Sequence, residues 1–476
     1  MNEVKTVDDF YQFDDEARDH IATVDARGNR VWIYPKKPKG NLHNYRILVT
    51  VVLLALLFSG PFLKIGGQPL LLLNFFERKF IIFGTPFWPQ DLHIFAIGTI
   101  TLFVFVILFT SAFGRVWCGW ACPQTLFMEM VFRKIEYWIE GDANQQRKLD
   151  AAPWNQEKIL KKGGKHFIFL VFSILIAHTV MAYLIGIDQV KDIIGKSPSE
   201  NWAGFVGLVS FTAIFYWVFA YFREQACTVV CPYGRLQGVL LNKDSLAVSY
   251  DFKRGEKRGK IKKEQVSEAQ GDCIDCKLCV HACPTGIDIR NGTQLECVNC
   301  TACIDACNDV MDKVEKPRGL IRVSSYNGIL QGAQRIFTTR IAGYSVLLAL
   351  LLTLLSFLIV NRSDVEITIL RVPGQLYQKT EDGQYTNLYS IQFINKTFDA
   401  ISLEVSIKGE GVISRVGEGA IEVPANGQTD GVFFVKLDPS ILQGYKTPID
   451  LVFKNSNGLM IERETNFFGP ATSVKK

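Results

Sequence analysis

The sequence predicts a multidomain membrane protein. An α-helical membrane bundle of five transmembrane helices carries a cysteine-rich insert and a C-terminal all-β sandwich. Three observations predict this fold class: five long stretches lack charged residues, all twelve cysteines fall into two loops, and residues 362–476 alternate polar and apolar side chains. Because 48% of the 476 residues are hydrophobic and 21% are charged, the apolar residues must be concentrated, which excludes an ordinary soluble enzyme.

Each charge-free stretch is long enough to cross a bilayer, whose hydrocarbon core needs about 17 to 25 helical residues. The stretches are Ile47 to Leu63, Leu92 to Gly114, His166 to Ile187, Asn201 to Phe222 and Ile341 to Asn361. The first 40 residues are polar and mixed in charge, so we expect no signal peptide.

Basic residues predict the orientation of the bundle. Six Lys or Arg residues lie between Arg27 and Arg46, and the loops after the second and fourth stretches are also strongly basic. The positive-inside rule puts these segments in the cytoplasm and, after five crossings, residues 362–476 outside. The net charge is +5, and the excess basic residues lie beside the predicted membrane spans and not in one block. A nucleic-acid partner is therefore not expected.

The tail after residue 361 predicts an immunoglobulin-like sandwich. Runs such as Val365 to Ile369, Tyr389 to Phe393 and Leu403 to Ile407 alternate as half-buried strands do. Turn signals such as Asp382-Gly383 and Asn426-Gly427 separate the runs. This region contains no cysteine, so no disulfide is expected in it.

Eight cysteines form the bacterial two-cluster ferredoxin pattern. Cys273, Cys276, Cys279 and Cys283 have the spacing C-x2-C-x2-C-x3-C and are followed by a proline; Cys297, Cys300, Cys303 and Cys307 repeat it 24 positions later, with Asn308 in the proline position. Three thiolates of one tight loop reach one cubane and the fourth ligates the neighbouring cubane. We assign Cys273, Cys276, Cys279 and Cys307 to one 4Fe-4S cluster, and Cys297, Cys300, Cys303 and Cys283 to the other.

A pair of four-cysteine zinc sites is the alternative for these eight residues. It is disfavoured because zinc ribbons normally use two separated cysteine pairs. The cytosol keeps thiols reduced, so disulfides are disfavoured as well. No Gly-rich nucleotide-binding fingerprint occurs in the chain, and a nicotinamide cofactor is therefore not expected.

The other four cysteines form two C-x3-C-P motifs. Cys118 and Cys122 follow the second apolar stretch, and Cys227 and Cys231 follow the fourth. We interpret the two helix pairs as a duplication. An i, i+4 pair on a helix faces one way, and four converging thiols suit cuprous copper, which prefers soft ligands. A redox-active dithiol, a third cluster and inert buried cysteines remain alternatives.

The predicted domain boundaries follow from these patterns. They are 1–46 for a cytoplasmic arm, 47–250 for the four-helix region with both C-x3-C-P motifs, 251–271 for a basic linker, 272–316 for the ferredoxin domain, 317–340 for a connector, 341–361 for the fifth helix and 362–476 for the sandwich.

This order of segments, together with the basic stretch Arg147 to Trp154, closely resembles the FixG/RdxA/CcoG family of cytochrome c oxidase accessory proteins, which are membrane-bound polyferredoxins. The resemblance covers nearly the whole chain. It implies a place in the bacterial inner membrane, with a periplasmic sandwich, and a role in assembly of the cbb3-type oxidase through reduction of cupric to cuprous copper. It assigns copper handling to Cys118, Cys122, Cys227 and Cys231, and cluster binding to the eight ferredoxin cysteines.

The expected partners are the lipid bilayer, a cytosolic electron donor, a copper chaperone or transporter, oxidase assembly components and a second copy of the chain. Two other functions stay open. One is a non-enzymatic copper chaperone or assembly scaffold, and the other is an electron conduit to a quinone or another membrane partner.

Overall fold

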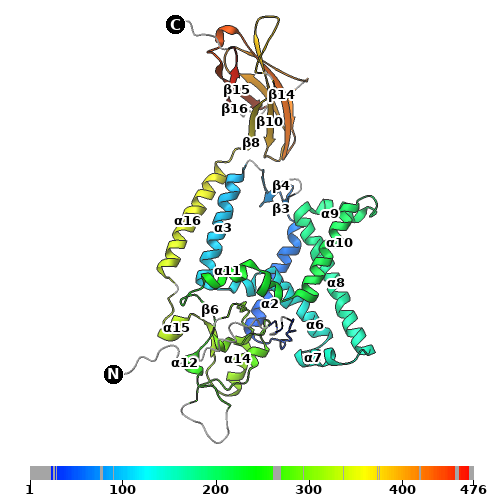
Figure 1. The fold of residues 1–476 in the computed structure, drawn as a ribbon, viewed down its shortest axis with the longest axis vertical. Helices are drawn as coiled ribbons and strands as arrows, with labels where there is room; N and C mark the ends of the chain where they lie inside the picture. The colour runs from blue at the N-terminus through cyan, green and yellow to red at the C-terminus, as the bar shows by residue number, and fades with distance from the viewer. Residues whose placement is uncertain are drawn as a thin grey trace, which may run out of the picture. The chain divides into compact units, whose positions relative to one another are not determined.

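The structure is a computed structural model of the whole chain (Figure 1). It describes residues 23–470 except 25–26, 28, 76–78, 89–90, 261–269, 293, 336, 373, 375, 418–419 and 456–459. Parts of the predicted N-terminal arm, basic linker and C-terminal tail therefore lie outside the described residues. The chain divides into two compact units: one comprises residues 1–63, 71–74 and 95–355, and the other 64–70, 75–94 and 356–476.

Five helices are long and apolar enough to cross a membrane, as predicted. They are α2 (Asn41–Ser59, extended by η2 Gly60–Phe62), α3 (Leu92–Phe113), α8 (Gln156–Ile185), α10 (Trp202–Trp217, extended by the π-helical η5 Val218–Phe222) and α16 (Thr339–Val360). The third helix begins ten residues before its apolar stretch, because Lys162 and Lys165 in its first turns pair with buried carboxylates.

Short helices follow three of these spans. After α3 come α4 (Val116–Trp120), α5 (Pro123–Leu126), the π-helical η4 (Phe127–Phe132), α6 (Arg133–Ile139) and α7 (Ala143–Ala151). After η5 come the π-helical η6 (Ala226–Val230) and α11 (Pro232–Leu240). The helix α9 (Ile187–Gly195) follows α8. The C-x3-C-P motifs lie in the first two of these groups.

The cysteine-rich domain is built on one small antiparallel sheet. Strand β6 (Ala247–Tyr250) pairs with β7 (Ile321–Ser324), and the cysteine loops lie between them in the chain. Short helices complete the domain: α12 (Phe252–Gly255), α13 (Leu278–His281), η7 (Ile289–Asn291), α14 (Ala302–Lys313) and α15 (Tyr326–Gln331). Its core combines apolar residues of the sheet with Cys273, Cys279 and Cys307.

The second unit contains the β-sandwich predicted from the alternating pattern. One sheet has the order β12-β14-β10-β8, with β9 beside β10, and the other has the order β13-β11-β15-β16. The strands are β8 (Val365–Arg371), β9 (Gln378–Lys379), β10 (Tyr385–Asn395), β11 (Ile401–Ile407), β12 (Val412–Arg415), β13 (Ile421–Val423), β14 (Gly427–Leu437), β15 (Lys446–Asn455) and β16 (Met460–Phe468). The short helix η8 (Pro439–Ile441) lies between β14 and β15 in the chain. Alternate residues, among them Phe393, Val435 and Phe453, are fully buried in its core.

A buried ion pair joins the sandwich to the segment before α3, within the second unit. Asp91 accepts from Lys396 Nζ at 2.6 Å and from Arg362 Nη2 at 2.8 Å, and Lys396 also contacts Glu366 at 2.7 Å. The segment between α2 and α3 also forms short strands: β1 (Lys64–Ile65), β2 (Gln68–Pro69), β3 (Leu71–Asn74), β4 (Lys79–Ile82) and β5 (Thr85–Phe87).

Candidate functional site

Two cavities in the cysteine-rich domain each collect one predicted set of four cysteines. The first is lined by Cys273, Cys276, Cys279 and Cys307. The second is lined by Cys283, Cys297, Cys300 and Cys303, and Cys279 touches it as well. Apolar side chains such as Val248 and Ile321 complete the linings. Four thiols around an apolar cavity form a donor set that fits a 4Fe-4S cluster.

The two cysteine loops share one backbone conformation. Asp275 and Lys277 have φ angles of 50° and 56°, and the residues 24 positions later, Asn299 and Thr301, have φ angles of 52° and 64°. Left-handed residues between right-handed ones form nests, in which successive N–H groups point into one concavity and favour an anion. The repeat seen in the sequence is therefore also a repeat in conformation.

The two repeats differ after their fourth cysteine. Pro284 follows the short helix α13, which ends at His281, whereas Asn308 lets α14 continue to Lys313. The Asn308 side chain also accepts a hydrogen bond from the Gly319 N–H at 3.0 Å. Proline interrupts a helix. Because Asn308 stands where the first repeat has a proline, Cys307 is part of a long helix that packs beside β7.

The C-x3-C-P pairs do not lie on continuous helices, and the sequence-based prediction of an i, i+4 helical pair was wrong in this respect. Cys118 belongs to α4, whereas Cys122 precedes α5; Cys227 belongs to η6, whereas Cys231 precedes α11. The residue before a proline is disfavoured in the α region, so each helix breaks at the second cysteine.

The two breaks are nearly identical. Cys122 has φ −65° and ψ 122°, and Cys231 has φ −63° and ψ 113°. Each cysteine N–H donates to the carbonyl five residues earlier at 2.9 Å, and each following proline starts a helix. Proline is well suited to this first helical position. Both thiols thus lie at equivalent helix starts, which is consistent with the duplication inferred from sequence.

The first C-x3-C-P loop (residues 115–123) and the second (residues 223–232) lie against each other. Cys227 Sγ is 3.8 Å from the Thr125 hydroxyl, and Cys118 Sγ is 3.5 Å from the side-chain amide of Gln237 in α11. A Cβ atom at Gly234 in α11 would lie 3.1 Å from Arg115 Nη2 of the first loop. Elements that follow one motif therefore contact a cysteine of the other.

The first C-x3-C-P loop also packs against the second cluster loop (residues 297–303). Cys118 lies against the buried group of Val298, Cys300 and Ala302. A Cβ atom at Gly119 would lie 2.4 Å from the Val298 carbonyl oxygen, and Trp120 Nε1 donates to the Asn299 carbonyl at 3.3 Å. The backbones approach closely because residue 119 has no side chain. A C-x3-C-P cysteine thus packs against the buried group that contains a predicted cluster ligand.

Burial dominates the protonation of these thiols. It raises the pKa of Cys227 to about 12, against a hydrogen bond from Thr125, and it raises the pKa of Cys118, against the charge of Arg115. In the second cluster loop, burial raises the pKa of Cys297 to about 12 and of Cys300 to about 11. Metal ions bind the deprotonated form, so binding at these thiols releases protons.

No group of three or more His, Cys, Asp or Glu side chains in the described part of the chain is arranged to hold one metal ion. The predicted four-thiol copper site therefore stays a prediction. Met128, a thioether candidate close to Cys122, packs in an apolar core with Phe127 and Phe219.

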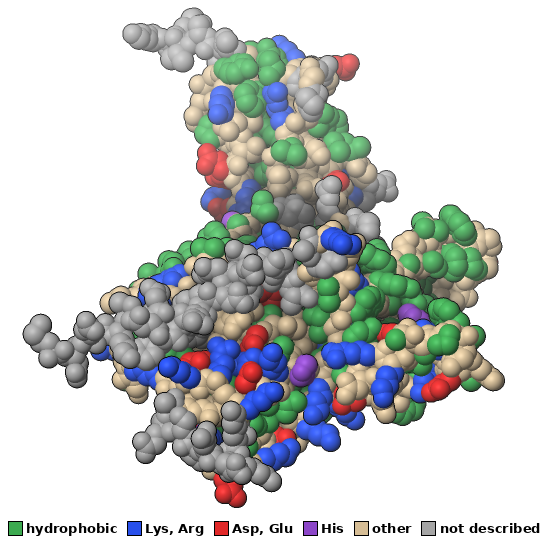
Figure 2. All heavy atoms as spheres, turned by 60° about the horizontal axis from the view of Figure 1, so that its bottom comes forward, with side chains coloured by type: hydrophobic (Ala, Val, Ile, Leu, Met, Phe, Trp, Pro, Cys, Tyr) green, Lys and Arg blue, Asp and Glu red, His purple; other side chains and the backbone are tan. Residues whose placement is uncertain are grey.

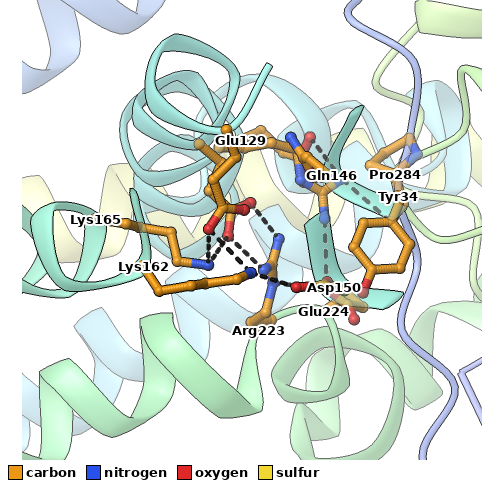
Figure 3. A network of polar contacts seen from close by, with 12 residues as sticks. Tyr34, Glu129, Gln146, Asp150, Lys162, Lys165, Arg223, Glu224 and Pro284 are labelled. Atoms are coloured by element: carbon orange, nitrogen blue, oxygen red, sulfur yellow. Dashed lines mark hydrogen bonds and ion pairs between the residues drawn. The ribbon is translucent and has the colours of Figure 1, made fainter. Parts of the chain in front are cut away.

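A buried network of charges lies beside the second C-x3-C-P loop (Figure 3). Arg223 donates to both carboxylate oxygens of Glu136 at 2.8 Å. Burial raises the pKa of the Glu136 carboxyl, but Arg223 and Lys165 outweigh it and hold that pKa below its usual range. Since Arg223 precedes Cys227 by four residues, this pair fixes the start of the loop.

The same network reaches the cysteine-rich domain and the N-terminal arm. Arg133 contacts Glu224 at 3.5 Å and donates to the Pro284 carbonyl at 3.5 Å, next to Cys283. Arg30 of the arm contacts Glu224 at 3.2 Å. Further along, Lys162 bridges Glu140 and Asp150 at 3.0 and 2.5 Å. The network therefore links one C-x3-C-P loop to the position beside a predicted cluster ligand.

No functional role was predicted from the sequence for five residues of this region: Thr125, Gln237, Arg46, Arg115 and Glu136. The two arginines contributed only to the positive charge expected on the cytoplasmic side. One signal was available, because an arginine precedes the first cysteine of both C-x3-C-P motifs by three or four residues. The contacts of Thr125 and Gln237 depend on tertiary packing, and no sequence signal for them is apparent.

Three family models match the chain. The "4Fe-4S dicluster domain" matches residues 222–326, and the "4Fe-4S binding domain" matches residues 95–141. The "IG-like fold at C-terminal of FixG" matches residues 355–470. These matches support iron–sulfur clusters in the helical unit, and they confirm an immunoglobulin-like C-terminal domain.

Curated relatives match most of the chain. Protein RdxB of Cereibacter sphaeroides is 34% identical over 83% of this chain and 86% of its own length. The nitrogen fixation protein FixG of Rhizobium meliloti is 31% identical over 79% of each chain. Protein RdxA of Cereibacter sphaeroides is 31% identical over 85% of this chain and 88% of its own length.

Among solved structures, that of a FixG-related protein from Vibrio parahaemolyticus is similar to 22% of this chain and 97% of its own, with 25% identity and a TM-score of 0.20. The relatives match over most of this chain, and the C-terminal domain is of the FixG type. Together with the two cysteine-lined cavities, these matches show that the chain belongs to the FixG/Rdx family of membrane-bound iron–sulfur electron-transfer proteins.

Proposed function

We propose that this protein reduces cupric to cuprous copper at the C-x3-C-P thiols, and that the product serves assembly of a cbb3-type cytochrome c oxidase. The observation that carries the proposal is the packing of Cys118 against the buried group that contains Cys300. An electron that leaves the second cluster would then have Cys118 as an acceptor-side residue packed against the same buried group.

The proposed cluster ligands are the two crossed sets. Cys273, Cys276, Cys279 and Cys307 would hold the first cluster, and Cys283, Cys297, Cys300 and Cys303 the second; each set lines one cavity. When bound, such clusters supply one electron at a time. Cys279 lines both cavities, so the two clusters would be adjacent.

The thiols match the proposed product better than the substrate. One electron converts one cupric ion to one cuprous ion while one reduced cluster becomes oxidised. Cuprous copper prefers thiolate ligands, so reduction strengthens binding at Cys118, Cys122, Cys227 and Cys231. Thr125 and Gln237 hold the two loops together and keep the thiols of both motifs in one region.

The test uses purified full-length protein in detergent, reduced under anaerobic conditions. Addition of cupric ion should produce cuprous ion, detected with a cuprous-specific chelator, as the cluster absorption bleaches in proportion. Replacement of Cys118, Cys122, Cys227 and Cys231 by Ser should abolish this reaction and leave about eight irons per chain, as two cubanes require. Copper binding without bleaching would instead indicate a chaperone or scaffold.

A third cluster at the C-x3-C-P thiols is a second candidate, because the "4Fe-4S binding domain" model covers Cys118 and Cys122. The chain would then carry about twelve irons, and the four Ser substitutions would remove about four. Such a chain would conduct electrons to a quinone or another membrane partner.

We further propose that the N-terminal arm and cysteine-rich domain are cytoplasmic and the sandwich periplasmic. Figure 2 shows Lys and Arg side chains spread over the end of the helical unit that carries the cysteine-rich domain. Such positive charge is typical of the cytoplasmic side. A cytosolic electron donor would then reach the clusters directly. Protease treatment of intact spheroplasts should cleave the sandwich but spare the cysteine-rich domain.

A further inference from the structure

Two buried arginines tie the C-x3-C-P loops to their surroundings. Arg46, in the first turns of α2, is 3% exposed, and its Nε donates to the Gly119 carbonyl at 2.7 Å. Arg115, just before α4, is 5% exposed, and its Nη2 donates to the Gly234 carbonyl at 2.8 Å. One arginine thus holds the residue after Cys118, and the other holds the helix that follows Cys231.

Neither arginine has a carboxylate partner among the residues that the structure describes. Besides backbone carbonyls, Arg115 donates only to the neutral Gln237 side chain. Arg46 Nη2 and Arg115 Nη1 are buried without any hydrogen-bond partner. Other buried arginines nearby differ, since Arg133 and Arg223 pair with glutamates. A buried charge without a counter-ion is strongly unfavourable, so an anion is expected beside these two guanidinium groups.

The cysteine thiols of the first C-x3-C-P loop and of the second cluster loop are the candidate anions. Arg115 and Cys118 share the Gln237 side chain. The Gly119 carbonyl held by Arg46 belongs to the backbone that packs on Val298, next to Cys297. In agreement with this geometry, Arg115 opposes the effect of burial on the pKa of Cys118 and Cys297, and Arg46 does so for Cys300.

The first cluster site has a different charge balance. Arg290, beside Cys279, pairs with Asp275 and Asp288 at 2.6 Å each, and Arg254, on the Cys307 side, pairs with Asp272. Arg290 and Arg254 at the first site are therefore neutralised by carboxylates, whereas Arg46 and Arg115 at the second site are not. Lys277, which also lines the first cavity, is exposed to solvent. Near the second site, the carboxylate of Glu129 raises the pKa of Cys300, but Glu129 is itself paired with Arg133 at 3.1 Å.

We propose that Arg46 and Arg115 are the counter-ions of the metal–thiolate centres at this junction, and that they hold the second cluster at a higher reduction potential than the first. Reduction adds a negative charge to an anionic cluster, and a nearby buried positive charge stabilises the reduced form. Electrons then run from the first cluster to the second and on toward the C-x3-C-P thiols. The inference rests on the cluster ligands of the proposed function but not on copper.

The experiment is an anaerobic redox titration of the full-length protein, followed by paramagnetic resonance, in the absence of copper. Wild type is compared with Arg115→Gln, Arg46→Gln, the charge-preserving Arg115→Lys and Arg46→Lys, and Arg254→Gln as a control. At a fixed potential, we expect each Gln variant to lower the ratio of reduced to oxidised second cluster at least about tenfold, which equals about 59 mV for a one-electron couple. The first cluster should keep its midpoint in these variants.

The Lys variants separate charge from structure. Lysine keeps the charge but loses part of the hydrogen-bonding fork, so a counter-ion role predicts a midpoint near that of wild type. Equal shifts in the Lys and Gln variants, or no shift in either, would overturn the proposal. Arg254→Gln should leave the second midpoint unchanged. A wild-type iron content well below about eight per chain would instead refute the ligand assignment of the proposed function.

Discussion

The contact at Gly119 makes the route from the cluster to the C-x3-C-P thiols testable with one methyl group. In Gly119→Ala the new Cβ would lie 2.4 Å from the Val298 carbonyl oxygen and 2.8 Å from that of Asn299. Both are backbone atoms and cannot rotate away. An ordinary contact requires the first C-x3-C-P loop to move away by about 1 Å, or the packing to absorb about 1 to 3 kcal/mol of strain.

Such a movement would separate the thiol from its neighbour loop. The hydrogen bond from Trp120 Nε1 to the Asn299 carbonyl is already 3.3 Å long and would be lost. Electron transfer through protein slows as the distance between donor and acceptor grows. We expect cupric reduction by the chemically reduced protein to slow several-fold, with iron content and cluster midpoints unchanged.

The matched control is Gly163→Ala, because Gly163 also lies in a helix and a Cβ there meets no atom within 4 Å. Stopped-flow bleaching of the cluster absorption after addition of cupric ion measures both variants. If Gly119→Ala oxidised its clusters at the wild-type rate while its fold and iron content were intact, electrons would not pass through this contact.

Three further substitutions test the charge and helix arguments. Glu136→Gln leaves buried Arg223 without its bidentate partner and should cost about 3 to 5 kcal/mol in chemical denaturation, whereas the exposed Glu157→Gln should leave the denaturation midpoint unchanged. Asn308→Pro should interrupt α14 after Cys307 at a cost of about 3 kcal/mol, whereas Asn308→Ala should keep the helix. Both variants should keep about eight irons per chain, because Pro284 follows Cys283 at the equivalent position and Cys283 still lines its cavity. Asp91→Asn should destabilise the second unit by about 3 kcal/mol. Lys396 and the Trp88 N–H outweigh burial and lower the pKa of Asp91. The contribution of Asp91 to the free energy of unfolding is therefore complete above its unfolded-state pKa, and it is lost as the pH falls through the folded-state pKa. A pH series of denaturation curves should show this loss in wild type and not in Asp91→Asn.

Local patterns in the sequence predicted much of the architecture. Five charge-free stretches gave five helices, and the period-two runs after residue 361 gave strands, since each signal concerns residues that are close in the chain. The cysteine repeat even extends to the left-handed residues Asp275 and Asn299. The break at Cys122 and Cys231 was also predictable, because a proline restrains the residue before it.

The site depends on contacts that no local pattern encodes. Arg115 and Gln237 are 122 positions apart, and Glu136 and Arg223 are 87 apart. From the sequence, the arginines were expected only to contribute to the positive charge at one end of a membrane helix. In the structure both arginines are buried, and their roles depend on their partners. Arg223 pairs with the carboxylate of Glu136 and stabilises a loop, whereas Arg115 has no carboxylate partner among the described residues.

The buried thiols and the two arginines without carboxylate partners each disfavour folding in the absence of metal. Burial raises the pKa of Cys297 and Cys300 and keeps these thiols neutral, so they do not compensate Arg46 and Arg115. Metal binding deprotonates the thiols and thereby supplies the missing negative charge. Cluster insertion should therefore stabilise the helical unit and not the sandwich, whose core contains no cysteine. Removal of iron by a chelator should lower the melting temperature of the first unit alone; an equal loss in both units would contradict this coupling.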